Sequence, residues 1–323
     1  MYDPSDAVRF IAAHSLFLVL GHKEPDGDCI ASQITFGSLL KALGKTVRLY
    51  SVGPFDRPEI TPFQAEFADS IRAEERVGGA VVILDCSTPD RTGRLGSEAE
   101  GLPTLVIDHH SAGEVFGDAR MVDSSSPSTT MLVQALYEAL GVAPDAETCR
   151  LLLFGLCTDT GFFRHLGRGS QEIYRAVARL VERGTSTADV YMMVYGRREL
   201  ASRKLLGEML GRAESYADGR LILTWQTTAD RQRLHAQQRG EDDLYRLLQT
   251  VKDNVVVAAI KQEAEDLYSV GLRSTAAVDV GTVASSFGGG GHRQAAGFDI
   301  HGTLESVKER VVHALLPLVS GSS

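Results

Sequence analysis

Thr104-Leu-Val-Ile-Asp-His-His110 is a short apolar run that ends in three adjacent side chains able to bind a metal ion or to move a proton. The apolar part is typical of a buried strand in a parallel sheet, whose strands are almost continuously apolar. In open α/β sheets, ligands bind just beyond the carboxyl ends of the strands. The stretch therefore predicts an α/β fold with an active site at Asp108, His109 and His110.

Three more apolar segments lead to polar side chains of the same kind. One ends at His22 and continues into the turn His22-Lys-Glu-Pro-Asp26-Gly-Asp28, one ends at Asp85, and one is followed by Asp159. A single acid after a strand more often caps the next helix. Four segments that all end in such groups favour one shared active site over four separate caps.

The length of 323 residues is enough for two domains, each with its own core. The polar segment Gly184-Thr-Ser-Thr is the best candidate for a boundary between them. We predict a metal-binding catalytic domain with a parallel sheet at 1–184, a linker at 185–200 and a smaller α/β domain at 201–323. The active site is expected in the cleft between the two domains.

The hydrophobic periodicity predicts the individual elements of both domains. In the first domain we expect helices over 4–14, up to about 43, 124–140, 145–156 and 171–183, and strands leading to His22 and over 45–52, 77–85 and 104–107. In the second we expect helices over 199–216, 241–251 and 304–316, the last ended with the help of Pro317, and strands over 220–225, 255–261 and 267–273.

The net charge of −9 argues against a broad surface for long duplex nucleic acid, so a nucleic-acid substrate is expected to be short RNA or a nucleotide. Residues 1–185 hold 17 Lys and Arg against 25 Asp and Glu, a balance of −8; the remainder holds 16 against 17, a balance of −1. The acidity therefore lies with the His and Asp motifs. Bound cations would offset part of it, and acids that confer solubility account for the same balance.

The sequence predicts a cytoplasmic protein without membrane contact. The longest apolar runs fall short of the roughly 20 residues that span a bilayer. Asp3 and Asp6 stand where a signal peptide would carry positive charge. The four cysteines form no CxxC pair, which suits a reducing compartment, and we interpret Cys29, Cys86 and Cys157 as small packing residues.

The motifs supply imidazoles and carboxylates, which favour Mn²⁺ or Mg²⁺ over structural zinc; the histidines favour Mn²⁺. About six such ligands are too many for one tetrahedral site and suit two ions that share a carboxylate. Such a pair activates water and neutralises phosphoryl oxygens, so phosphoester hydrolysis is the expected reaction. His110 could then hold the phosphate or protonate the leaving oxygen. The candidate ligands are His22, Asp26, Asp28, Asp85, His109 and Asp159.

The second domain carries candidate anion-binding groups. Gly288-Gly-Gly-Gly-His292 lets backbone N–H groups approach an anion closely, with His292 as a further donor. The nearby Ala295-Ala-Gly297 permits tight backbone packing, which favours an ordered anion loop over a flexible one. Arg273, at the end of an apolar strand, is equally compatible with binding a base or phosphate and with an ordinary surface position.

Taken together, these motifs resemble those of the DHH phosphoesterase superfamily. The two-domain length is similar to that of the NrnA-type oligoribonucleases and pAp phosphatases. One departure is Ala31, where the first motif often carries glycine. The matching residues are His22-x-x-x-Asp26-x-Asp28, Asp85, Asp108-His109-His110 and Thr158-Asp159-Thr-Gly-Phe-Phe-Arg164, then Leu272-Arg273-Ser274, Gly288 to His292 and Ala295-Ala-Gly297 of a DHHA1 domain.

This resemblance implies two bound Mn²⁺ ions that share Asp85, with Mg²⁺ or Co²⁺ as substitutes. One ion would bind His22 and Asp26, and the other the remaining candidate ligands. The resemblance further implies that Asp108 orients the site, and we assign a catalytic role to His110. The expected nucleotide-binding residues are Arg164, Arg273, Gly289, Gly290, Gly291 and His292.

The resemblance leaves several activities open. Hydrolysis of short oligoribonucleotides and of 3′-phosphoadenosine 5′-phosphate (pAp) is expected first; a phosphodiesterase for cyclic or linear dinucleotides would have the same build. A DHH-DHHA2 pyrophosphatase would carry a basic Arg-Lys-Lys stretch, which this sequence lacks, and a RecJ-type exonuclease would need an added domain. An inactive nucleotide sensor would show no Mn²⁺-dependent turnover. A monomer and a homodimer are both compatible with the sequence.

Overall fold

The computed structural model describes residues 3–196, 198–236, 241–275 and 278–320. The chain forms two compact units, residues 1–197 and 198–323, and each has its own sheet and hydrophobic core. The first sheet is parallel and the second is mixed, which confirms the predicted α/β class. Within the described residues, every helix is too short or too polar to cross a membrane.

The sheet of the first unit has the order β2-β1-β3-β4-β5, and every neighbouring pair is parallel. The carboxyl ends of its strands therefore lie at one edge. Strand β5 was not predicted, because it is short and only Met121 within it is buried. The strands are β1 (Leu16–Leu20), β2 (Thr46–Tyr50), β3 (Gly79–Leu84), β4 (Thr104–Asp108) and β5 (Ala119–Val122).

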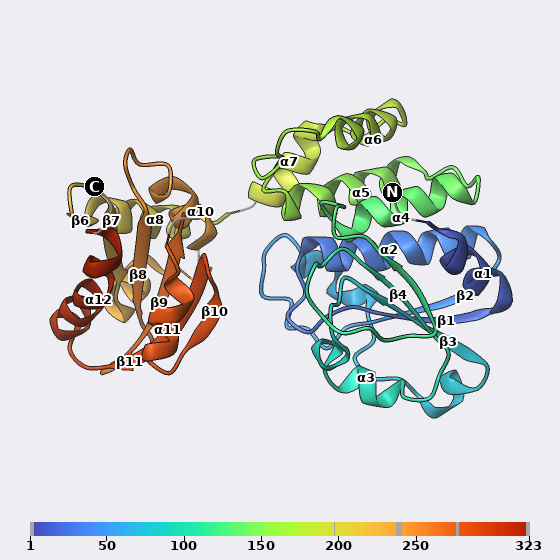
Figure 1. Cartoon of the computed structure of the whole chain (residues 1–323), viewed down its shortest axis with the longest axis horizontal. Helices are drawn as coiled ribbons and strands as arrows, with labels where there is room; N and C mark the ends of the chain where they lie inside the picture. The colour runs from blue at the N-terminus through green and yellow to red at the C-terminus, as the bar shows by residue number, and fades with distance from the viewer. Residues whose placement is uncertain (1–2, 197, 237–240, 276–277, 321–323) are drawn as a thin grey trace. The chain divides into compact units, whose positions relative to one another are not determined.

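Helices cover both faces of this sheet, as Figure 1 shows. The larger core joins one face of the strands to α1, α2, α4 and α5, and the smaller core joins the other face to α3. The helices are α1 (Ser5–Ala13), α2 (Gly27–Ala42), α3 (Arg94–Glu98), α4 (Thr129–Ala139) and α5 (Ala146–Asp159), with short 3-10 helices η1 (Thr61–Glu66), η2 (Ala73–Arg76) and η3 (Pro89–Thr92).

The segment predicted as a linker, 185–200, contains helix α7 (Thr187–Tyr195). Its buried side chains Val190 and Val194 join the core of the first unit, and α7 packs against α5 as does α6 (Gln171–Glu182). The polar residues that suggested a linker form the turn before α7, where the Ser186 hydroxyl accepts the first-turn Asp189 N–H. Most of the predicted linker therefore belongs to the first unit.

The second unit is built on a six-stranded sheet of order β10-β11-β9-β8-β7-β6, in which β7 and β8 are parallel and the other pairs antiparallel. Apolar residues of α8 and α10 cover one face, and those of α11 and α12 cover the other. The strands are β6 (Glu214–Tyr216), β7 (Leu221–Gln226), β8 (Val256–Gln262), β9 (Leu267–Ser274), β10 (Gly290–His292) and β11 (Ala295–His301). The helices are α8 (Leu200–Gly211), α9 (Thr228–Leu234), α10 (Glu241–Leu248), α11 (Val280–Ser286) and α12 (Leu304–Val319).

Three helix ends of the second unit differ from prediction. The helix predicted over 241–251 ends at Leu248. The helix predicted over 199–216 ends at Gly211, because Glu214–Tyr216 instead pairs with β7 as an edge strand. Helix α12 continues past Pro317 to Val319. Proline disfavours this turn, but the Ser320 N–H still donates to the Leu316 carbonyl (3.0 Å), and the buried Val319 keeps the turn packed on the core.

Candidate active site

The carboxyl edge of the first sheet holds three of the predicted side chains. His22 follows β1 by two residues, Asp85 follows β3 directly, and Asp108 is the last residue of β4. Asp85 has a left-handed backbone (φ 58°), a conformation that aspartate tolerates better than most residues. Its N–H still donates to the Ile107 carbonyl (3.0 Å), so the turn stays attached to β4 while the carboxylate is aimed out of the strand.

Helix termini supply three more predicted groups. Asp26 is the N-cap of α2 and accepts the Cys29 N–H (3.1 Å), and Asp28 lies in the first turn of the same helix. Asp159 is the last residue of α5. With His22, Asp85 and His109 they form what we call the acidic cluster.

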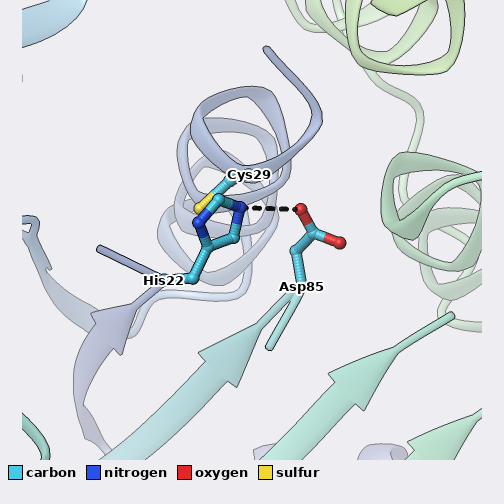
Figure 2. A group of neighbouring side chains, drawn as sticks. All are labelled: His22, Cys29 and Asp85. Carbon is cyan, nitrogen blue, oxygen red and sulfur yellow. Dashed lines mark ion pairs between the residues drawn. The ribbon is translucent and has the colours of Figure 1, made fainter. Parts of the chain in front are cut away.

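His22 presents one ring nitrogen to two carboxylates of this cluster. Its Nδ1 lies 2.8 Å from the Lys23 carbonyl oxygen, which can only accept, so Nδ1 carries the hydrogen. Nε2 lies 3.5 Å from Asp85 Oδ2 and 3.9 Å from Asp26 Oδ1. Burial lowers the pKa of His22, but the neighbouring Cys29 and Asp85 outweigh burial and raise it to about 12. Nε2 therefore holds a proton toward the acids (Figure 2), and a bound metal ion would displace that proton.

His109 is arranged in the same way on the other side of Asp85. Its Nδ1 faces the Ser126 carbonyl (3.3 Å), and its Nε2 lies 3.1 Å from Asp159 Oδ2 and 3.5 Å from Asp85 Oδ1. Asp85 thus has one oxygen near each histidine. A nitrogen of His109 and carboxylate oxygens of Asp28 and Asp159 also lie within 4.8 Å of one another. The geometry is that of two neighbouring groups with one shared carboxylate.

The first turn of α4 holds the two most buried acids of the cluster. The backbone N–H groups of Thr129 and Thr130 donate to the two oxygens of Asp28 (2.6 and 3.0 Å), and the Thr130 hydroxyl adds a third hydrogen bond (2.7 Å). The Thr129 hydroxyl donates to Asp85 Oδ1 (3.0 Å). The sequence predicts helix caps for these hydroxyls; only Ser128, which accepts the Met131 N–H, acts in that way. Two adjacent threonines at a helix start carry too little information to reveal partners about 100 residues away.

His110 and Asp108 form a separate pair at the edge of the cluster. The Nδ1–H of His110 donates to Asp108 Oδ1 (2.7 Å), and that oxygen also accepts the His109 N–H (2.9 Å). The hydrogen bond to Asp108 raises the pKa of His110 above its ordinary value. Asp108 therefore fixes the ring of His110 and favours its protonated form.

Electrostatics in the cluster favour a bound cation. Burial lowers the pKa of His109, but hydrogen bonds to Asp159 and Asp85 outweigh burial and raise it to about 11. Burial and the neighbouring carboxylates of Asp159 and Asp85 raise the pKa of Asp28. Carboxylates that resist ionisation beside imidazoles that attract protons show an excess of negative charge, which divalent cations would neutralise. The donor set of nitrogen and oxygen atoms fits such ions.

The predicted substrate residue Arg164 lies in the turn after α5. Gly161, Phe162 and Phe163 before it all have positive φ (56°, 57° and 70°), which reverses the chain directly after Asp159. Arg164 is exposed, and its guanidinium donates to His165 Nε2 (3.1 Å). Contact between Arg164 and a substrate therefore stays a prediction.

The other predicted substrate residues belong to the second unit. Arg273, Gly289, Gly290 and Gly291 line a pocket of about 620 Å³. The guanidinium of Arg273 lies 4.6 Å above the Tyr245 ring, and Tyr245 and Lys261 line the same pocket. His292 is exposed in β10 and does not line it.

The glycine run is part of a hairpin. Gly290–His292 pairs with Ala295–Gly297 as antiparallel strands. A Cβ on Gly289 would lie 2.2 Å from the Gly297 oxygen, and one on Gly291 would lie 2.5 Å from Ala296 Cα. Close approach of β11 therefore requires glycine at these two positions. The loop is ordered, as expected, and it is ordered because its residues pair with β11.

Known proteins agree with this architecture. The DHH family, N-terminal domain, matches residues 16–156, and the DHHA1 domain matches residues 242–320. A bifunctional oligoribonuclease and PAP phosphatase NrnA from Thermus thermophilus is 31% identical over 295 residues, covering 91% of this chain and 87% of the relative. The chain belongs to the DHH family. The resemblance inferred from the motifs is thereby confirmed.

More distant relatives share parts of the chain or its fold. A manganese-dependent inorganic pyrophosphatase from Methanothrix thermoacetophila is 26% identical over 152 residues, which is 45% of this chain and 48% of that protein. The crystal structure of an exopolyphosphatase-related protein from Bacteroides fragilis has a TM-score of 0.87 at 22% identity, covering 99% of this chain and 98% of that one. Membership of the DHH family, with the NrnA relative, makes the chain a hydrolase of phosphoester bonds, as the sequence predicted.

Proposed function

We propose that this DHH-family phosphoesterase uses two Mn²⁺ ions to hydrolyse short oligoribonucleotides and pAp. The observation that carries the proposal is Asp85, with one carboxylate oxygen near His22 and the other near His109. A carboxylate placed between two imidazoles is the arrangement that a pair of ions with one shared ligand requires. The T. thermophilus relative, an oligoribonuclease and PAP phosphatase, supports the choice of substrates.

Manganese is the ion that we assign to the cluster. Bound divalent ions would lower the pKa of water and neutralise charge on the phosphoryl group. Carboxylates suit Mn²⁺ and Mg²⁺ equally, whereas imidazole ligands favour Mn²⁺. The similarity to a manganese-dependent pyrophosphatase over 152 residues supports this choice. Mg²⁺ and Co²⁺ are proposed as substitutes.

The side chains around the cluster would divide the remaining work. His22, Asp26, Asp28, Asp85, His109 and Asp159 hold the ions. His110, which Asp108 keeps oriented and biased toward protonation, donates a proton to the leaving oxygen. We assign binding of the nucleotide to the pocket of the second unit, where Arg273 and Lys261 supply positive charge.

One substrate panel tests the proposal. Metal-free protein is reloaded with Mn²⁺ or Mg²⁺ and given pAp, a 5′-phosphorylated RNA dinucleotide, a longer RNA, a cyclic dinucleotide and pyrophosphate. We expect pAp and the dinucleotide to be hydrolysed fastest, and faster with Mn²⁺. Asp85→Asn should remove essentially all activity, because both ions lose a ligand. Rapid cleavage of pyrophosphate without action on the dinucleotide would contradict the assignment, and preference for the cyclic substrate would move it to cyclic dinucleotides.

A further inference from the structure

A group of aromatic side chains, which we call the aromatic patch, follows the acidic cluster in the first unit. It joins Phe162 and Phe163, in the turn after Asp159, to side chains of α6 and α7, two helices that pack beside α5 (Figure 1). The members from the helices are Tyr174, Tyr191 and Tyr195. We propose that the patch stacks on the base of the second nucleoside of an RNA dinucleotide, the nucleoside that pAp lacks. The inference rests on the proposed function and adds a contact that favours RNA over pAp.

The five rings form one continuous group. Phe162 contacts Tyr191 and Tyr195, with ring centroids 5.3 and 6.1 Å apart. Phe163 contacts Phe162 (5.5 Å) and Tyr174 (5.8 Å). These contacts are tilted or T-shaped, with interplanar angles of 42° to 80°. A parallel stack between neighbours would cover the ring faces, so this arrangement leaves ring faces for an added base.

Part of the patch is open to solvent. The two phenylalanines and Tyr195 pack partly on the core of the unit, whereas Tyr174 and Tyr191 are 52% and 46% exposed. Exposed apolar side chains that adjoin one another mark a binding surface, whereas single ones are common on any protein. Every nucleobase has a flat π-face, so aromatic side chains can stack on it whatever the sequence of the RNA.

The turn fixes the patch close to a proposed metal ligand. Residues 161–163, directly after Asp159, all have left-handed backbones. The buried Thr160 holds this turn, because its hydroxyl accepts the Phe163 N–H (3.1 Å). Bulky residues in this conformation are strained, and such strain is concentrated at active sites and ligand-binding segments. The two phenylalanines are therefore held three and four residues beyond a proposed metal ligand.

The same turn carries positive charge in an acidic unit. Residues 161–170 contain Arg164 and Arg168 and no Asp or Glu, whereas residues 1–185 hold 17 Lys and Arg against 25 Asp and Glu. Both arginines are exposed. Arginine binds phosphate, and aromatic side chains beside basic ones are typical of surfaces for single-stranded nucleic acid. This charge favours a short RNA segment over a second protein chain as the occupant of the patch.

The two proposed substrates differ by one nucleoside. Each has a nucleoside with a 5′-phosphate and a phosphoryl group on its 3′ oxygen. Water attacks the phosphorus of that group, the bond to the 3′ oxygen breaks, and this oxygen takes a proton. In pAp the phosphoryl group ends the molecule, whereas in the dinucleotide it continues into a second nucleoside. A contact with the second base therefore acts on RNA and has no counterpart in pAp.

A dinucleotide without its second base tests the inference. We measure kcat/KM for pAp, for a 5′-phosphorylated diadenylate and for the same dinucleotide with an abasic second ribose. Tyr191→Ala should lower kcat/KM for the diadenylate by about fivefold to a hundredfold, the effect of losing one stacked base, and should change the other two values by less than about twofold. Tyr191→Phe keeps the ring and should match wild type. Met192→Ala, at the next position of α7 and 58% exposed, is the matched control.

The other outcomes separate this inference from the proposed function. An equal loss on all three substrates, or no loss on any, would overturn the role of the patch and leave the phosphoesterase intact. A wild-type dimer that Tyr191→Ala dissociates in sedimentation velocity, with unchanged relative rates, would make the patch a protein interface and also overturn it. If Tyr191→Ala does not fold, Tyr191→Leu repeats the test, because leucine fills the position without an aromatic face. Wild type that hydrolyses neither pAp nor the diadenylate with Mn²⁺, Mg²⁺ or Co²⁺ would overturn both.

Discussion

At the scale of single residues, Thr129 couples a helix start to the shared carboxylate. Its hydroxyl donates to Asp85 Oδ1 and its N–H to Asp28. Thr129→Val removes only the hydrogen bond that the hydroxyl donates to Asp85. Groups that hydrogen-bond to metal ligands typically contribute about tenfold to a hundredfold to metal affinity or activity. We expect the Mn²⁺ concentration for half-maximal activity to rise at least about tenfold, with recovery in Thr129→Ser. A lowered melting temperature with an unchanged Mn²⁺ requirement would show a purely structural role.

A second single residue, Glu75, predicts a pH dependence of stability. Hydrogen bonds from Arg72 and the Tyr50 hydroxyl outweigh its burial and lower the pKa of Glu75 from 4.5 to about 2. Because the folded pKa lies below the unfolded one, the ionised carboxylate stabilises the fold above about pH 4.5, and this contribution is lost as the pH falls toward about 2. The difference in free energy of unfolding between wild type and Glu75→Gln should therefore shrink over this interval. Urea unfolding at successive pH values measures it, and a constant difference would contradict the prediction.

At the scale of elements, the β10–β11 hairpin depends on one glycine more than on its neighbour. Gly291 has φ 137°, and a Cβ there would meet Ala296 Cα at 2.5 Å, whereas a Cβ on Gly290 would meet nothing within 4 Å. Gly291→Ala should reduce the free energy of unfolding by about 1–3 kcal/mol. Gly290→Ala is the matched control and should stay within about 0.5 kcal/mol of wild type. Equal losses in both variants would contradict the register of the hairpin.

Elements also show where sequence reasoning succeeds and where it fails. The parallel strands were predictable because short, continuously apolar runs are typical of buried parallel strands, and their common direction brought the predicted ligands together. Helix α7 was missed because its cap residues resemble a linker. The role of Thr129 and Thr130 depends on contacts between segments about 100 residues apart, which no local pattern encodes. The glycine run predicts an anion loop, although its spacing equally suits a strand packed closely on another.

At the scale of the whole molecule, the two units should fail in different ways when mutated. The first unit holds the acidic cluster and the second holds the pocket lined by Arg273. His109→Ala should abolish hydrolysis of every substrate, including a small artificial phosphodiester, since it removes a proposed metal ligand. Arg273→Ala should lower kcat/KM for the RNA dinucleotide by about tenfold to a hundredfold, the effect of losing one charge-assisted contact of about 1.5–3 kcal/mol. The artificial diester, which contacts none of the nucleotide pocket, should be hydrolysed at nearly the wild-type rate.

A control on the same unit separates binding from folding. Arg310 also lies over an aromatic ring, that of Phe287, and is exposed outside the pocket, so Arg310→Ala should leave both activities unchanged. Steady-state kinetics of wild type and the three variants on both substrates decide the outcome. If Arg273→Ala loses both activities in equal measure, the pocket supports the fold or the metal site. Substrate recognition would then have to be assigned to the first unit, where Arg164 is the remaining predicted contact.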